Sequence, residues 1–169
     1  MSVFTLQILA MVTMVFDHIG NCFMGGSVPM RCIGRFAFPI YAFLLAEGFR
    51  HIKNDESRVS SHLSAYVMLA LISELPYDIM EIKPLVWSAM IRTQNNIITL
   101  LIAFLGLIAI DKWKNKPLRI CSVVILSAFC NYFICSNYKF VGVLIVYAFY
   151  FYLNWAMDKN KNYLERLLM

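Results

Sequence analysis

The stretch that most constrains this chain is residues 31–50, RCIGRFAFPIYAFLLAEGFR, which is long and apolar enough to cross a bilayer yet carries charges inside it. A membrane-spanning helix needs roughly 20 mostly apolar residues. Arg35 and Glu47 lie within this stretch, and an ionisable residue at membrane depth costs at least about 2.5 kcal/mol on insertion scales. Such residues face a protein interior or a wet cavity. The stretch therefore predicts a polar site inside a membrane protein.

Pro39 lies between these two charged residues. Proline has no backbone N–H, and its ring clashes with the carbonyl four residues earlier, which is that of Arg35. We expect a helix kinked at Pro39, with the freed carbonyl beside the Arg35 guanidinium.

The composition agrees with a membrane protein. Hydrophobic residues make up 60% of the 169 residues and charged residues 15%, whereas a soluble domain carries about 25% charged residues. The mean hydropathy is +0.66. We predict one integral-membrane domain over residues 1–169, of the all-α class, with little mass outside the bilayer. The first apolar run continues without an A-x-A-like cleavage site, so we expect it to be retained.

Six segments read as membrane spans, because their apolar character runs all round the helix. We place them at about 3–24, 32–50, 63–80, 96–111, 120–136 and 140–157. Ten of the fifteen Lys and Arg residues lie in the loops after the second and fourth spans and in the C-terminal tail. By the positive-inside rule these regions and both termini are cytoplasmic. The net charge of +5 is thus a topology signal, and we expect no nucleic-acid partner.

This topology brings polar residues from five segments into the outer half of the membrane. They are Asp17 and His18 in the first span, Arg35 in the second, Glu74, Tyr77 and Asp78 in the third, Gln94, Asn95 and Asn96 opening the fourth, and Asn137, Tyr138 and Lys139 in the fifth turn. Pro76 is expected to break the third span, so that Tyr77 and Asp78 project from a loop. Tyr77 taken alone is typical of an interfacial aromatic anchor.

His18 is the candidate general base of this outer set. Adjacent helical residues lie about 100° apart, so Asp17 cannot easily orient His18. We expect partners from other spans: Arg35 for Asp17, and Glu74 or Asp78 for His18. A carboxylate that holds a histidine fixes its tautomer and stabilises the imidazolium. The alternative is that His18 only meets water at the interface.

The sequence allows two interpretations of Arg35. Its guanidinium is suited to hold a phosphate or a developing oxyanion. It is equally suited to pair with a buried acid and serve structure alone. Glu74 is our second choice, after Asp17, for such a pair.

A second ionisable set lies at the inner end of the same span. Glu47 and His51 are four residues apart on one helix face, and Arg50 and Lys53 add positive charge. This basic mouth favours either an anionic cofactor or lipid phosphate. The sequence has no H-E-x-x-H motif, paired-cysteine motif or His pair at i, i+4 within a span, so we expect no metal site.

Five blocks of the sequence resemble the TraX family. They are MVFDHIG at 14–20, RCIGRFAFPIYAFLLAEGFRH at 31–51, LISELPYD at 71–78, QNN at 94–96 and NYKFVGVL at 137–144. The resemblance covers nearly the whole chain. It implies a multi-pass protein of the bacterial cytoplasmic (inner) membrane that acetylates the N-terminus of conjugative pilin, with acetyl-CoA as donor. It also implies a relationship to transmembrane acyltransferases that acetylate sugars.

Two departures from the family pattern affect the expected acceptor. The family often shows an acidic residue and a glycine around the tyrosine of the last block, where this chain has Asn137 and Lys139. Relatives also commonly extend beyond the sixth span, whereas this sequence stops at Met169. Either departure is expected to change the acceptor or weaken the activity.

We therefore predict an integral-membrane acetyltransferase. It would move an acetyl group from cytoplasmic acetyl-CoA to an exported acceptor, either pilin or an envelope polymer, while lipid surrounds the bundle. The catalytic candidates are His18, Asp17, Glu74 and Asp78. The binding candidates are Arg35, Glu47, Arg50, Lys53, Tyr77, Gln94, Asn95, Asn137 and Tyr138. The alternatives are a small transporter or channel, since buried polar groups also mark a solute path, and a non-catalytic subunit of a pilus or secretion assembly.

Overall fold

The computed structural model describes residues 3–22, 28–81, 95–113, 116–133 and 138–167, and their side chains except those of 21–22, 74–81 and 158–167. Within these ranges every regular element is an α-helix, which confirms the predicted all-α class. The helices are α1 (Val3–Cys22), α2 (Val28–Gly34), α3 (Ala37–Ile52), α4 (Glu56–Glu81), α6 (Asn96–Lys112), α7 (Pro117–Phe133) and α8 (Lys139–Leu167).

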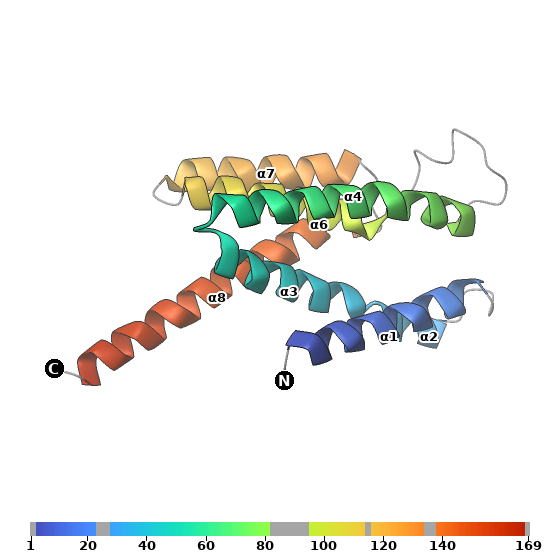
Figure 1. Cartoon of the computed structure of the whole chain (residues 1–169), viewed down its shortest axis with the longest axis horizontal. Coiled ribbons are helices and arrows are strands. Elements are labelled where there is room, and N and C mark those ends of the chain that lie inside the picture. The colour runs from blue at the N-terminus through green and yellow to red at the C-terminus, as the bar shows by residue number, and fades with distance from the viewer. Residues whose placement is uncertain (1–2, 23–27, 82–94, 114–115, 134–137, 168–169) are drawn as a thin grey trace.

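The helices form a layer with crossing helices beneath it (Figure 1). In that layer α4 packs on α6 and α6 packs on α7. Below it α3 and α8 pack against each other, and both also contact α6. The pair α1 and α2 packs together at the N-terminal side of α3 (Figure 1). This arrangement brings α1, α3, α4 and α6 around one region of the molecule.

The number of membrane-spanning stretches is smaller than the sequence prediction. Among the described residues, three stretches are both long and apolar enough to cross a bilayer: Val3–Gly20, Val28–Ile52 and Lys139–Met157. Helices α6 and α7 have 17 residues each, which is the lower limit for a span. Helix α4 has 26 residues, but it begins with the polar sequence ESRVSSH, which shortens its apolar part. The fold alone thus supports a helical membrane protein with three such stretches.

The expected kink at Pro39 is instead a break between two helices. Helix α2 ends at Gly34, Arg35 and Phe36 form a turn, and α3 begins at Ala37. Pro39 therefore lies in the first turn of α3, where its missing N–H removes no helical hydrogen bond. The carbonyl of Arg35 is free of the helix, as predicted, and it accepts a hydrogen bond from the Tyr138 hydroxyl at 3.4 Å.

The expected break at Pro76 is wrong, because α4 continues as a helix from Glu56 to Glu81. Proline is tolerated inside membrane helices, where neighbouring groups and small backbone adjustments satisfy the freed carbonyl. Tyr77 and Asp78 consequently belong to a helix and do not project from a loop.

The core lies where α3, α6 and α8 meet. Phe49 of α3 makes edge contacts with Phe104 of α6 and Tyr150 of α8, at ring-centroid distances of 5.6 and 5.8 Å. Ala42 and Ala46, one turn apart on α3, are fully buried. Small residues at such positions let helix backbones approach closely, which is the usual basis of packing in membranes.

Interhelical hydrogen bonds join the start of α6, the end of α7 and the start of α8. The hydroxyl of Thr99 donates to Asn131 Oδ1 at 3.2 Å. The amide nitrogen of Asn131 donates to the carbonyl of Lys139. Lys139 has φ 45°, a left-handed conformation that glycine adopts at no cost. The backbone at residue 139 therefore has a conformation that favours glycine over lysine.

Candidate functional site

One cavity of about 790 Å³ is lined by members of both polar sets predicted from the sequence, although Arg35, Arg50 and Lys53 are not among its lining residues. Its volume lies within the range of ligand pockets. The lining comes from α1 (Val3, Gln7, Met14, Asp17 and His18), α2 (Arg31 and Gly34), α3 between Ala37 and Ile52, α4 (His62, Tyr66 and Leu69), the start of α6 between Asn95 and Phe104, and Tyr138. Along α3 the lining runs from Ala37 to His51, about 21 Å at 1.5 Å per residue.

Asp17 and His18 line one end of this cavity, and both are half-buried. Gly34 of α2 allows α1 to approach closely, because a Cβ at Gly34 would lie 2.7 Å from the Cα of Asp17. The contact between Gly34 and Asp17 fixes the position of the last turns of α1 against α2. A short glycine contact therefore sets where Asp17 and His18 meet the cavity.

Arg31 and Asn96 line the same cavity and carry unsatisfied polar atoms. Among the described residues, Nε of Arg31 and Oδ1 of Asn96 are buried side-chain atoms without a hydrogen-bond partner. A buried donor or acceptor left unpaired costs about 1–3 kcal/mol, so each such atom in a native structure requires an explanation. The two atoms differ in character, because Nε–H only donates and Oδ1 only accepts.

Arg35 does not occupy the position expected of it. Its side chain is exposed in the turn between α2 and α3, and no ion pair joins it to Asp17 among the described side chains. The break before α3 places Arg31, four residues earlier, at the cavity instead. The pair with Glu74 falls on a side chain outside the described part of the chain.

Tyr138, a binding candidate from the sequence, lines the cavity. Its ring stacks on Phe38 at a centroid distance of 4.0 Å. Burial raises the pKa of Tyr138 above its ordinary value of 10.0, the negative charge of Asp17 raises this pKa further, and Arg35 lowers it. The Tyr138 hydroxyl therefore stays protonated at neutral pH and donates to the Arg35 carbonyl.

Asn95 caps the N-terminus of α6 and joins α6 to α4. Its side-chain oxygen accepts from the backbone N–H of Ile97 at 3.3 Å, and its amide nitrogen donates to the carbonyl of Ser73 at 3.4 Å. An asparagine at this position is a favoured N-cap. Asn95 lines the cavity, but its hydrogen bonds give it a structural role, whereas its neighbour Asn96 keeps an unpaired oxygen.

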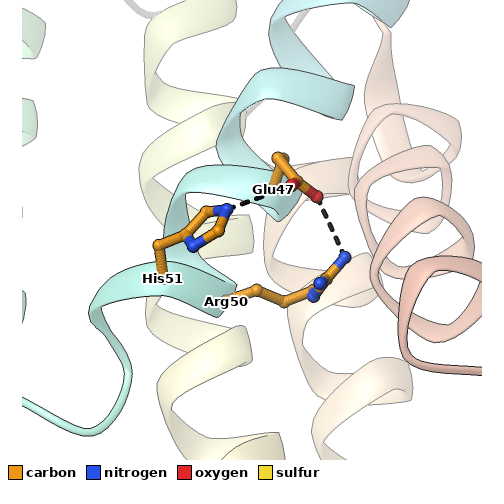
Figure 2. A network of polar contacts seen from close by, with 3 residues as sticks. All are labelled: Glu47, Arg50 and His51. Atoms are coloured by element: carbon orange, nitrogen blue, oxygen red, sulfur yellow. Dashed lines mark hydrogen bonds and ion pairs between the residues drawn. The ribbon is translucent and has the colours of Figure 1, made fainter. Parts of the chain in front are cut away.

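Glu47 organises the opposite end of the cavity (Figure 2). One carboxylate oxygen accepts from Arg50 at 3.0 Å, and the other lies 3.1 Å from Nε2 of His51. The predicted interaction between Glu47 and His51 is thus present. The spacing of three and four residues on α3 brings these side chains together.

The basic mouth is less charged than the sequence indicated. Arg50 is neutralised by Glu47. Nζ of Lys53 lies 3.2 Å from Asp111 of α6, and the hydroxyl of Tyr150 donates to the same carboxylate oxygen at 3.1 Å. These two cations and two carboxylates sum to no net charge. The sequence pattern missed Asp111 because it lies 58 residues from Lys53.

Several predicted site residues lie beyond what the structure describes. Gln94 and Asn137 fall outside the described residues, as do the side chains of Glu74, Tyr77 and Asp78. Within the described residues, no group of three or more His, Cys, Asp or Glu side chains could hold a metal ion.

Comparison with known proteins identifies the family. The sequence pattern of the TraX protein family matches residues 2–167. The chain belongs to the TraX family. It is also 28% identical over 157 residues to a protein of Dichelobacter nodosus described as "Probable fimbrial assembly protein FimC, serogroup H1", covering 88% of this chain and 63% of that protein. The chain therefore spans less than two thirds of that relative's length. No solved structure matches the chain.

Three of the cavity residues in this TraX chain carried little or no weight in the interpretation of the sequence: Arg31, Tyr66 and His62. His62 is exposed, and its Nδ1 lies 2.9 Å from the carbonyl of Arg58 in its own helix. The signal that identifies Arg31 is its position three residues before the end of α2. That signal is readable only once the helix break is known.

The end of the cavity near His18 offers groups that suit acyl transfer. His18 places an imidazole there, and an imidazole can serve as a general base. Arg31 offers a hydrogen-bond donor, and Asn96 offers an acceptor. These side chains come from three different helices that the fold assembles around one volume.

Proposed function

We propose that this TraX-family chain transfers acetyl groups from cytoplasmic acetyl-CoA to an exported acceptor, within a bundle that crosses the inner membrane six times. The observation that carries the proposal is the single cavity bordered by His18 at one end and by Glu47 and His51 at the other. A donor and an acceptor that start on opposite sides of a membrane require such a shared space.

The chemistry assigned to the chain is direct acyl transfer. The acceptor amine or hydroxyl attacks the thioester carbonyl carbon, and a bond forms from nitrogen or oxygen to that carbon. His18 takes the proton of the nucleophile as general base. The carbon–sulfur bond breaks, and the coenzyme A thiolate leaves and is protonated. A hydrogen-bond donor near the carbonyl oxygen stabilises the negative charge that develops there.

The end of the cavity near Glu47 receives the donor under this proposal. Arg50 and Lys53 are held near that end by Glu47 and Asp111. Their positive charges are thus fixed in place, and a bound phosphate would compete with the carboxylates for them. The aromatic residues Phe49 and Tyr66 provide the apolar lining farther in.

The test is an acetyl transfer assay with the full-length chain in lipid nanodiscs. Radiolabelled acetyl-CoA is supplied with a synthetic peptide that has a free amino terminus, or with an oligosaccharide, and the labelled product is separated from the donor. Formation of an acetylated product that depends on the protein supports the proposal. No product, and no saturable binding of acetyl-CoA, overturns it.

A non-catalytic role in fimbrial assembly is the second candidate. It is favoured by the description of the Dichelobacter nodosus relative as a probable fimbrial assembly protein. That role predicts that deletion of the gene abolishes surface fibres, whereas His18→Gln leaves them intact. The acetyltransferase proposal predicts that His18→Gln and deletion share any defect in acceptor modification. Uptake of a labelled solute into proteoliposomes without chemistry would instead indicate a transporter.

The six-span topology is tested by cysteine labelling. Ser60 is an exposed residue near the start of α4, and under this proposal it faces the cytoplasm, because basic residues lie near it in the sequence. In a cysteine-free background, Ser60→Cys should react with a membrane-impermeant maleimide only after the cells are opened. Ser27→Cys should react in intact spheroplasts. Labelling of Ser60→Cys but not Ser27→Cys in spheroplasts would show that the chain has the opposite orientation in the membrane.

A further inference from the structure

We infer that Arg31 and Asn96 hold the two reacting groups: Arg31 binds the thioester carbonyl oxygen, and Asn96 binds the nucleophile of the acceptor. This inference rests on the proposed function and deepens it, because it assigns the two halves of the reaction to named atoms. Neither residue was a site candidate from the sequence, in which Arg35 was the candidate to hold a phosphate or an oxyanion, or to pair with a buried acid.

The first step concerns the unsatisfied atoms. In the described part of the chain, the buried side-chain atoms without a partner are Nε of Arg31 and Oδ1 of Asn96. Both residues line the cavity that also contains Asp17 and His18. Native proteins pair nearly all buried polar groups. Two unpaired atoms on the lining of one cavity are therefore explained by bound groups that pair with each of them.

The second step concerns direction. Nε–H of Arg31 can only donate, so its partner must be an acceptor such as a carbonyl oxygen. Oδ1 of Asn96 can only accept, so its partner must carry an N–H or O–H. A thioester carbonyl and an amine or hydroxyl nucleophile supply these two groups, and they are the two reactants of acyl transfer.

The third step concerns charge during the reaction. When the nucleophile attacks, the carbonyl oxygen becomes negative, and a fixed guanidinium beside it stabilises that charge more than it stabilises the neutral carbonyl. Asn96 accepts a hydrogen bond from one N–H of an amine nucleophile, or from the hydroxyl next to the attacking one in a polyol, and so orients the acceptor. His18 removes a different proton, the one that leaves the attacking nitrogen or oxygen. Arg31 therefore affects the rate of the chemical step, whereas Asn96 affects the binding of the acceptor.

Other polar side chains of the cavity do not fit these roles as well. Asn95 already uses both ends of its amide, for Ile97 and Ser73. Tyr138 donates to the carbonyl of Arg35. Glu47 is held by Arg50 and His51. Arg31 and Asn96 retain unused hydrogen-bonding atoms.

The experiment measures cleavage of acetyl-CoA by the full chain in nanodiscs, with water, glycinamide and glycerol as nucleophile probes. We expect Arg31→Leu to lower kcat by about 10²- to 10³-fold with every nucleophile, while the Kd for acetyl-CoA changes less than about twofold. We expect Asn96→Leu to raise KM for glycinamide or glycerol by about 3- to 10-fold, with a smaller effect on kcat.

Two conservative variants separate chemistry from folding. Asn96→Asp keeps an acceptor oxygen and should retain the wild-type KM, whereas Asn96→Leu should not. Guanidinium ion added to Arg31→Ala should restore part of kcat, because it supplies the missing donor. A residue with a purely structural role would show neither effect.

The outcomes distinguish this inference from the proposed function. If wild-type protein cleaves acetyl-CoA and the Arg31 and Asn96 variants keep normal parameters, or lose kcat and binding together without the expected split, the assignment is wrong and the acetyltransferase stands. If wild-type protein cleaves acetyl-CoA with none of the three nucleophiles, both are overturned.

Discussion

Lys53, at the end of α3, forms an ion pair with Asp111 of α6 at 3.2 Å, and Tyr150 of α8 donates to the same carboxylate oxygen at 3.1 Å. Three helices thus converge on one carboxylate. The side chains of Lys53 and Asp111 are 24% and 21% exposed. This position joins the C-terminal ends of α3 and α6 to the middle of α8.

Lys53→Met should lower the free energy of unfolding by about 1–3 kcal/mol, between the small value of an exposed pair and the roughly 3–5 kcal/mol of a fully buried one. The double variant Lys53→Met with Asp111→Asn should lose less than the sum of the single changes. Tyr150→Phe is the matched control, which removes one hydrogen bond worth about 1 kcal/mol. Denaturation in detergent followed by circular dichroism measures these values, and additive losses would show that the pair contributes nothing.

Glu47→Gln should tighten acetyl-CoA binding if the donor enters at the inner end. The change releases Arg50 from its carboxylate, so a phosphate can use the guanidinium. An improvement of about fivefold, or roughly 1 kcal/mol, is expected at low salt, and it should shrink as salt is added. Asp55→Asn is the control, since it frees Arg58 from an exposed pair outside the cavity lining. Equal effects of the two changes would mean that only general surface charge matters.

Gly34→Ala should displace α1 from α2 and lower both stability and activity. The new Cβ would lie 2.7 Å from the Cα of Asp17, which is backbone and cannot move aside freely. Overpacking of this kind costs about 1–3 kcal/mol. Gly48→Ala is the control on α3, where a Cβ meets nothing within 4 Å, and it should gain up to about 1 kcal/mol. Thermal unfolding of the two variants should therefore move in opposite directions.

Lys139→Gly should stabilise the protein. Lys139 has φ 45°, and relieving a side chain from the left-handed region is worth about 1 kcal/mol. The carbonyl of residue 139 can still accept from Asn131. Lys139→Ala is the control, because it removes the charge but keeps the Cβ. An equal gain in both variants would point to the charge and not to the backbone conformation.

His18→Ala should remove most acetyl transfer, because loss of a positioned base costs about 10²- to 10⁴-fold in rate. His18→Gln should fail similarly, since an amide keeps a hydrogen bond but takes no proton. Acetyl-CoA binding should persist in both variants. His62→Gln is the matched histidine control, because His62 is exposed and its ring bonds the Arg58 carbonyl of its own helix. Near-normal turnover of His18→Gln would show that His18 is not the general base and would make Glu74 or Asp78 the next candidate.

Local spacing in the sequence was sufficient to predict the cluster around Glu47. Glu47, Arg50 and His51 lie three and four residues apart, and helix geometry brings such side chains together whatever the rest of the fold does. The high apolar content likewise predicted helices that satisfy their own backbone hydrogen bonds, which a bilayer requires.

Spacing was insufficient to predict which arginine between α2 and α3 lines the cavity. The sequence predicted a kink at Pro39 that would bury Arg35, but the helix ends at Gly34. A helix break and a helix kink turn the chain in different directions, so the arginine that lines the cavity is Arg31, with its Nε buried, and not Arg35. Proline disfavours a continuous helix in either case. The choice between the two depends on the contacts of α2 with α1.

What the sequence by itself determined about this chain is its helical class, its membrane character, its family and the groups that share one helix face. These follow from composition, from the family's sequence blocks and from periodicity within a single helix. Only the tertiary structure decided that Lys53 meets Asp111, that Tyr138 meets the Arg35 carbonyl, and that both polar ends border one cavity. The physical reason is that such contacts join residues 58 or 103 positions apart, so they depend on how whole helices pack.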